Sequence, residues 1–165
     1  VLMDSDLGGC LFGMTLQTRP EEIYRALMEG IAFGKRMIIE QMERAGVRCR
    51  LLYATGGVAK KNPLIMQIMA DVLNREIMVP AIANGSCMGS AMFGAVAAGR
   101  KGGGYDTIEE AVEAMGPPVG KTYIPSQSAS VVYDALFEMY REMYLYLGKD
   151  SSMLKRLAAM RGKEK

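Results

Sequence analysis

Residues 51–71 read LLYATGGVAKKNPLIMQIMAD, and this segment carries the strongest structural signal in the chain. Four mainly apolar residues meet Thr55-Gly56-Gly57, and a helical pattern begins near Asn62. The order predicts a strand, a glycine turn and a helix. Adjacent glycines can adopt positive φ and admit a ligand close to the backbone, and the helix directs free N–H groups at the turn. Such a corner suits the phosphate or sugar edge of a nucleotide, although a Gly-Gly pair alone is more often only a tight turn.

The composition indicates a single globular domain without an obvious polyanionic partner. The chain has 165 residues, of which half are apolar and 23% are charged. Its net charge of +2 is too small to argue for nucleic acid. Residues 149–165 hold six basic and two acidic side chains, a net of +4, which leaves −2 for residues 1–148. A solvated helix end explains this basic tail better than an anionic partner.

The absence of histidine limits the chemistry of this chain. Without histidine, Ser-His-Asp and Cys-His nucleophile systems and histidine-based zinc sites are excluded. Phosphoryl transfer remains open, because it depends mainly on positioning and charge stabilisation. The three cysteines, Cys10, Cys49 and Cys87, are widely spaced and favour a reducing cytoplasm over a disulfide scaffold. No signal peptide or stretch of 18 apolar residues is present, so no membrane contact is expected.

Strand-like and helical segments alternate along the chain. Strands are expected at 10–16, 51–54 and 76–79, and an extended segment at 123–125. A capping box from Thr18 to Glu21 starts a helix that Gly46 ends. Further helices are expected at 63–73, 87–98, 107–115, 128–147 and 151–160. The alternation indicates an α/β fold, and the small number of strands predicts additional strands before Val1.

Several blocks of sequence, taken in order, resemble one family. They are GGCLFGMT (8–15), RALMEGIAF (25–33), TGGVAKKNP (55–63), QIMADVL (67–73) and MGSA (88–91). Together they closely resemble the C-terminal domain of the FGGY carbohydrate kinases. The runs RMIIE (36–40) and KNPL (61–64) make the chain most similar to the L-ribulokinases within that family. The resemblance covers nearly all of residues 4–148.

The resemblance implies a fold and a nucleotide site. The family has two actin-like domains with ribonuclease-H-like cores, and ATP lies in the cleft between them, largely on the C-terminal domain. It implies that residues 1–148 are a partial, N-terminally truncated C-terminal domain, followed by a basic helical tail at 149–165. Gly56 and Gly57 resemble the family's adenosine motif, and Lys61 and Asn62 would begin the helix that borders the adenine pocket. The small-residue helix near Gly89 resembles a segment that packs near the interdomain hinge.

The resemblance also implies what the chain lacks. The family's general base and its two phosphate loops match no part of these residues, so no catalytic or metal-binding residue is assigned. The full-length parent would transfer the γ-phosphoryl group of MgATP to a ketopentose such as ribulose. The 165-residue chain is expected to be inactive alone, to lack its N-terminal kinase domain as a partner, and to form homo-oligomers through bared sheet edges and apolar patches.

Two other interpretations remain open. The Gly56-Gly57 corner could belong to a stand-alone module that binds nucleotide without turnover. Alternatively, the Met- and Tyr-rich helix at 128–147 could be the core of a purely structural interaction domain. Calorimetric titration with ATP, ADP and AMP distinguishes the first of these from a kinase half-site. Micromolar binding favours the stand-alone module, and very weak binding favours the half-site.

Overall fold

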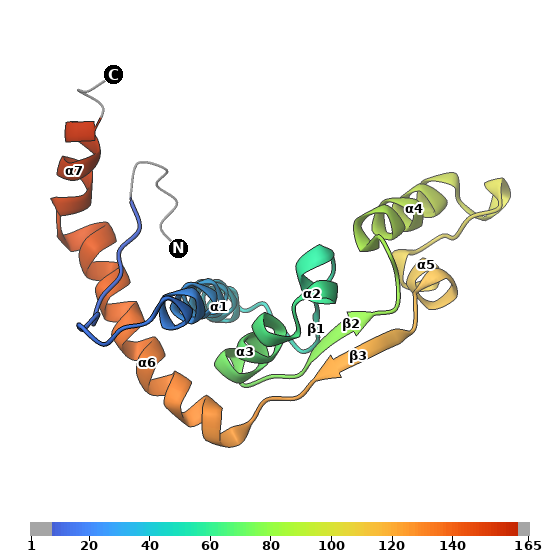
Figure 1. The fold of residues 1–165 in the computed structure, drawn as a ribbon. Coiled ribbons are helices and arrows are strands. Elements are labelled where there is room, and N and C mark those ends of the chain that lie inside the picture. The colour runs from blue at the N-terminus through green and yellow to red at the C-terminus, as the bar shows by residue number, and fades with distance from the viewer. Residues whose placement is uncertain (1–7, 162–165) are drawn as a thin grey trace. The chain divides into compact units, whose positions relative to one another are not determined.

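The computed structural model describes residues 8–161, and the chain forms two compact units. The first, called here the helical unit, comprises residues 1–49, 71–74 and 126–165. The second, called the sheet unit, comprises residues 50–70 and 75–125. Figure 1 shows the elements of both units in chain order. The candidate site lies in the sheet unit.

The sheet unit is built on three strands in the order β1-β2-β3. β1 (Leu52–Tyr53) runs parallel to β2 (Ile77–Pro80), and β2 runs antiparallel to β3 (Val119–Tyr123). Ile77 lies opposite Tyr123, and both side chains are buried. Because side chains alternate between the faces of a strand, Val79 is buried on the same face as Ile77.

The helices of the sheet unit start where the sequence supplies caps. α4 (Gly85–Ala98) begins after Asn84, whose Oδ1 accepts a hydrogen bond from the Cys87 amide at 3.3 Å. α5 (Ile108–Met115) begins after Thr107, whose hydroxyl accepts one from the Glu110 amide at 3.3 Å. Both are side-chain N-caps of the usual type. The two helices pack against each other, as Figure 1 shows.

The corner between β1 and β2 contains two helices in succession. α2 (Gly57–Lys61) is a short helix, and α3 (Pro63–Leu73) follows it. The bounds of α3 match the sequence prediction. Residues 63–70 of α3 belong to the sheet unit and residues 71–73 to the helical unit.

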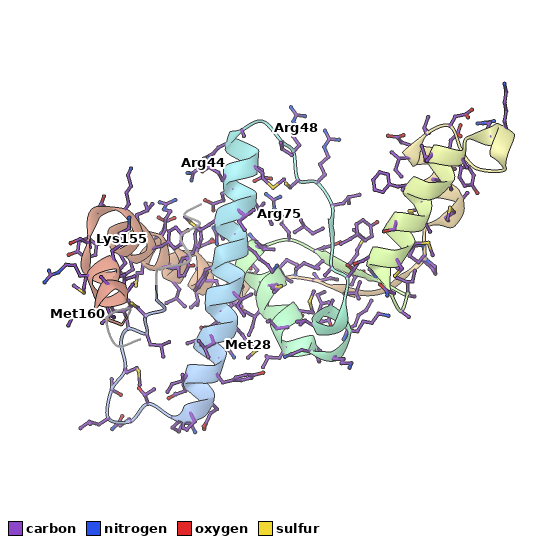
Figure 2. All side chains as sticks on the ribbon, turned by 90° about the horizontal axis from the view of Figure 1, so that it is seen from above. Met28, Arg44, Arg48, Arg75, Lys155 and Met160 are labelled. Atoms are coloured by element: carbon purple, nitrogen blue, oxygen red, sulfur yellow. The ribbon has the colours of Figure 1, made fainter. Side chains whose placement is uncertain are left out.

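The helical unit is held together by aromatic packing between α1 (Pro20–Arg44) and α6 (Gln127–Leu145). Phe33 of α1 contacts Tyr133 edge-on, with ring centroids 6.1 Å apart, and also contacts Phe137 and Tyr140. Figure 2 shows the side chains of α1, with Met28 and Arg44 labelled toward its two ends. After α6 come a π-helical turn (Tyr146–Asp150) and α7 (Met153–Arg161).

The ends of α1 follow the predicted signals with a shift of one residue. The N-cap is Arg19, whose amide donates to Glu22 Oε2 at 2.8 Å, and the predicted cap Thr18 instead accepts a hydrogen bond from the Thr15 amide. At the other end Gly46 has φ +90°, and its amide donates to Glu43 O. The Val47 amide donates to Met42 O, which completes a Schellman motif.

The structure departs from the sequence prediction at three places. Residues 10–16 form no strand, and Leu11, Phe12 and Leu16 are exposed. A strand requires hydrogen bonds from a neighbouring strand, and residues 8–161 offer this segment no such neighbour. The third strand of the sheet is β3, where the sequence indicated only a short extended segment. The helix α2 was also not expected, because the sequence analysis placed a glycine turn at Gly56-Gly57 and started the next helix near Asn62.

Candidate functional site

The glycine corner begins where β1 ends. The Ala54 amide still donates to Met78 O of β2 at 2.9 Å, and the backbone then turns away from the sheet at Gly56. Gly56 has φ +94° and ψ −177°, a combination that is essentially restricted to glycine. This conformation ends the extended segment and allows α2 to start at Gly57. The first glycine is therefore required by the turn itself.

The corner is open to solvent. Gly56 and Gly57 are both exposed, and beyond their chain neighbours and the backbone of α2 no described heavy atom lies within 4 Å of the position a Cβ would occupy on either residue. Gly57 has no positive φ, so its backbone conformation does not require glycine. Its lack of a side chain leaves the N-terminal edge of α2 accessible to a ligand. Lys61, the last residue of α2, is exposed as well.

Asn62 joins the two helices of the corner. It ends α2, where its amide donates to Val58 O at 3.0 Å, and its Oδ1 accepts a hydrogen bond from the Ile65 amide at 3.1 Å. With Pro63 as the first residue of α3, Asn62 occupies the N-cap position, where asparagine is among the preferred residues. The sequence predicted that Lys61 and Asn62 begin the following helix. Lys61 instead ends α2, and Asn62 caps α3.

The start of α4 lies against this corner. A Cβ on Gly85 would lie 2.8 Å from Thr55 Cγ2 and 2.9 Å from Thr55 Cβ. Thr55 immediately precedes Gly56, so the glycine turn begins beside the N-terminus of α4, and Lys61 and Asn62 follow it along the same segment. Their role in binding a nucleotide stays a prediction. The contact with Gly85 was not expected from the sequence, because only the tertiary fold brings residues 55 and 85 together.

Two glycines of α4, Gly89 and Gly94, are not closely packed against other elements of the sheet unit. A Cβ added to Gly89 or Gly94 would meet no described heavy atom within 4 Å outside the backbone of the helix itself, and Phe93 is exposed. Met92 is the buried residue of this helix. The proximity of α4 to an interdomain hinge, which the family resemblance implies, stays a prediction.

A surface hollow lies at the end of α4 that is far from the glycine corner. It has a volume of about 370 Å³ and is lined by Arg100, Gly104, Tyr105, Glu110, Glu113 and Ala114. Arg100 pairs there with Asp106 at 2.8 Å and with Glu110. None of the predicted site residues lines this hollow. These ion pairs of Arg100 join the two ends of the loop between α4 and α5.

The described residues contain neither a metal-binding cluster nor a helix that could span a membrane. Among residues 8–161, no group of three or more Cys, Asp or Glu side chains is arranged to hold a metal ion. In the same part of the chain, no helix combines the length and apolar character that a membrane span requires.

Comparison with known proteins identifies the family. Residues 1–98 match the C-terminal domain of the FGGY family of carbohydrate kinases. A ribulokinase from Bacillus licheniformis is 51% identical over 160 residues, which cover 97% of this chain and 29% of that protein. A ribulokinase from Halalkalibacterium halodurans is 46% identical over 162 residues, which cover 98% of this chain and 29% of that protein.

Solved structures of sugar kinases share the fold. A ligand-bound xylulose kinase from Lactobacillus acidophilus aligns with a TM-score of 0.72 at 26% identity, covering 90% of this chain and 30% of that one. A xylulose kinase from Rhodospirillum rubrum aligns with a TM-score of 0.68 at 27% identity, covering 82% of this chain and 26% of that one.

The chain belongs to the FGGY family of carbohydrate kinases. The family resemblance seen in the sequence is thus confirmed, and so is the α/β fold class of an actin-like sugar kinase. The chain spans about 29% of the length of the ribulokinases that it matches. The division at residue 148 stays a prediction, because the helical unit contains α6 and α7 together.

Proposed function

We propose that this chain is the nucleotide-binding part of an ATP-dependent carbohydrate kinase that phosphorylates a ketopentose such as ribulose. The observation that carries the proposal is the open, side-chain-free corner at Gly56 and Gly57 in a chain of this family. High identity with ribulokinases over nearly the whole chain supports ribulose as the sugar. The sugar contacts themselves are proposed to lie mainly outside these residues.

In the proposed reaction the γ-phosphoryl group of MgATP passes to a primary hydroxyl of the sugar. Magnesium would offset the negative charge of the phosphates during transfer. In this chain, the backbone of Gly56 and Gly57 would lie against the adenosine, because no side chain blocks its approach. Lys61 and Asn62 would border the adenine, with Asn62 also holding α2 and α3 together through its cap.

The chain alone is proposed to bind ATP or ADP without transferring phosphate. The family resemblance assigns the general base and both phosphate loops to regions that residues 1–165 do not match. Turnover would then require the N-terminal kinase domain as a partner. A cytoplasmic location is consistent with Cys10, Cys49 and Cys87, which are all among the described residues and form no disulfide.

We also propose that the 165-residue chain self-associates weakly. β1 lies at an edge of the sheet, so one side of this strand offers backbone hydrogen-bonding groups to a neighbour. Leu11, Phe12 and Met14 add exposed apolar surface near the N-terminus. Light scattering over a range of concentrations tests this, and a constant monomer mass at the highest concentration would refute it.

Calorimetric titration of the chain with ATP, ADP and AMP tests the nucleotide site. Weak binding that Gly57→Val abolishes supports the proposal, because valine would fill the open corner without requiring an unusual backbone conformation. The matched control is Gly94→Val, which places the same side chain on an open position of α4. Micromolar affinity by the chain alone would favour a stand-alone binding module. Equal titrations for wild type and Gly57→Val would favour a structural role without nucleotide.

A further inference from the structure

Gly85, the first residue of α4, is kept small by the space around it. A Cβ added there would lie 2.8 Å from Thr55 Cγ2, 2.9 Å from Thr55 Cβ and 3.3 Å from Thr55 Oγ1. Separations below about 3.4 Å are tighter than ordinary van der Waals contact between carbon atoms. The φ of Gly85 lies outside the left-handed region, so its backbone conformation alone would accept alanine.

The other glycines of α4 show that this restriction is local. A Cβ on Gly89 or Gly94 would meet no described heavy atom within 4 Å outside the helix backbone. Alanine is favoured over glycine inside a helix by about 1 kcal/mol. Steric contact with Thr55 is therefore what distinguishes position 85 from positions 89 and 94.

Thr55 has little freedom to move away from Gly85. Its β-branched side chain has few accessible rotamers, and its Cβ is attached directly to the backbone. The next residue is Gly56, whose φ of +94° defines the turn into α2. On the other side, the cap between Asn84 and the Cys87 amide holds the start of α4 in place. A displacement of Thr55 would thus pass to the Gly56-Gly57 corner.

We propose that Gly85 is a positioning residue for nucleotide binding. It acts through Thr55, because the missing Cβ lets the start of α4 lie directly against the loop and hold the Gly56-Gly57 corner in its open geometry. The inference rests on the proposed function of that corner as an adenosine site. It assigns a role to a residue 28 positions beyond Gly57 that neither helix propensity nor backbone conformation explains.

A double-mutant cycle tests the inference on the 165-residue chain. The variants are Gly85→Ala, Thr55→Gly and the double variant, and the probe is ATP, titrated while the amide resonances of residues 56 and 57 are followed by NMR. We expect Gly85→Ala to weaken ATP binding about tenfold, a change of about 1.4 kcal/mol. In the double variant the three Thr55 atoms that the new Cβ would meet are gone, so most of the affinity lost in Gly85→Ala should return.

The matched control is Gly89→Ala, one turn further along the same helix, which should leave ATP affinity unchanged. Unchanged affinity in Gly85→Ala would overturn the inference while leaving the nucleotide site intact. A loss that Thr55→Gly does not rescue, accompanied by a loss of helix signal in circular dichroism, would also overturn it, since that outcome indicates general destabilisation. Absence of ATP binding by the wild-type chain would refute the proposed site, and the positioning role with it.

Discussion

The hydroxyl of Tyr133 on α6 donates a hydrogen bond to Glu29 Oε1 on α1 at a distance of 2.9 Å. The same hydroxyl accepts one from the Arg25 guanidinium at 2.9 Å, and Arg25 also pairs with Glu29 at 2.8 Å. Tyr133 is nearly fully buried, and its ring contacts Phe33. This three-residue network joins the two long helices of the helical unit at a site where a buried polar group is fully paired.

Alkaline pH should weaken the helical unit through Tyr133. Burial, and next the hydrogen bond to Glu29, raise the pKa of Tyr133 above the ordinary tyrosine value of about 10. The unfolded chain therefore loses this proton first, so the free energy of unfolding falls as pH rises from about 10 through the folded pKa. We expect Tyr133→Phe to show a smaller decrease over this range in chemical unfolding followed by circular dichroism.

Tyr140 provides a second measurement on the same helix. Burial, with a smaller contribution from Tyr144, raises the pKa of Tyr140 as well, so Tyr140→Phe should also reduce the alkaline loss of stability.

At neutral pH Tyr133→Phe should lower the free energy of unfolding by about 1 kcal/mol, since Glu29 loses a hydrogen bond. An alkaline stability curve for Tyr133→Phe that parallels the wild-type curve would contradict this account.

The cap at Asn62 should be replaceable by other N-cap residues. Asn62→Ala removes the acceptor for the Ile65 amide and should lower the free energy of unfolding by about 1 kcal/mol. Asn62→Asp keeps an acceptor oxygen at this position and should retain most of that stability. Thermal unfolding of the two variants measures the difference. Equal losses in both would show that the side-chain oxygen does not act as the cap.

The two glycines of the corner should respond differently to alanine. Gly56→Ala forces a side chain into positive φ and should destabilise the protein by about 1–2 kcal/mol. Gly57→Ala carries no such strain and meets no described neighbour, so its stability should equal or exceed that of the wild type. Urea unfolding of both variants provides the comparison. A similar loss in both would mean that Gly57 is constrained in a way that its φ does not reveal.

Gly104 should be among the glycines least tolerant of substitution. A Cβ at this position would overlap the carbonyl oxygen of Ala95, which also accepts a hydrogen bond from the Tyr105 amide at 3.1 Å. Because the obstacle is helix backbone, Gly104→Ala should cost about 1–3 kcal/mol and detach the loop from the end of α4. Gly94→Ala is the control and should stabilise α4. Thermal unfolding of the two should shift in opposite directions.

Local signals predicted most of the helices of this protein. The bounds of α3 were predicted correctly because Pro63 and the apolar pattern after it mark its start. α5 follows from Thr107, which caps the Glu110 amide as expected. These signals act within a few residues, so they can be recognised without knowledge of the rest of the fold.

The strands were predicted less well. The apolar run at 10–16 has strand-like composition, but it is not a strand, since pairing depends on a neighbour that composition does not supply. β3 was expected only as a short extended segment and runs from Val119 to Tyr123, because β2 offers it hydrogen bonds across the register that joins Ile77 to Tyr123.

The sequence by itself determined the family, the α/β class and the glycines that allow an open corner, because these depend on residue types and their order along the chain. It also predicted a glycine turn at Gly56-Gly57 between a strand and a helix. Only the tertiary structure showed that Asn62 links two helices and that Gly85 lies against Thr55. Contacts between residues distant in sequence depend on how the chain packs. The local sequence around a residue does not predict how much space the packed structure leaves for its side chain.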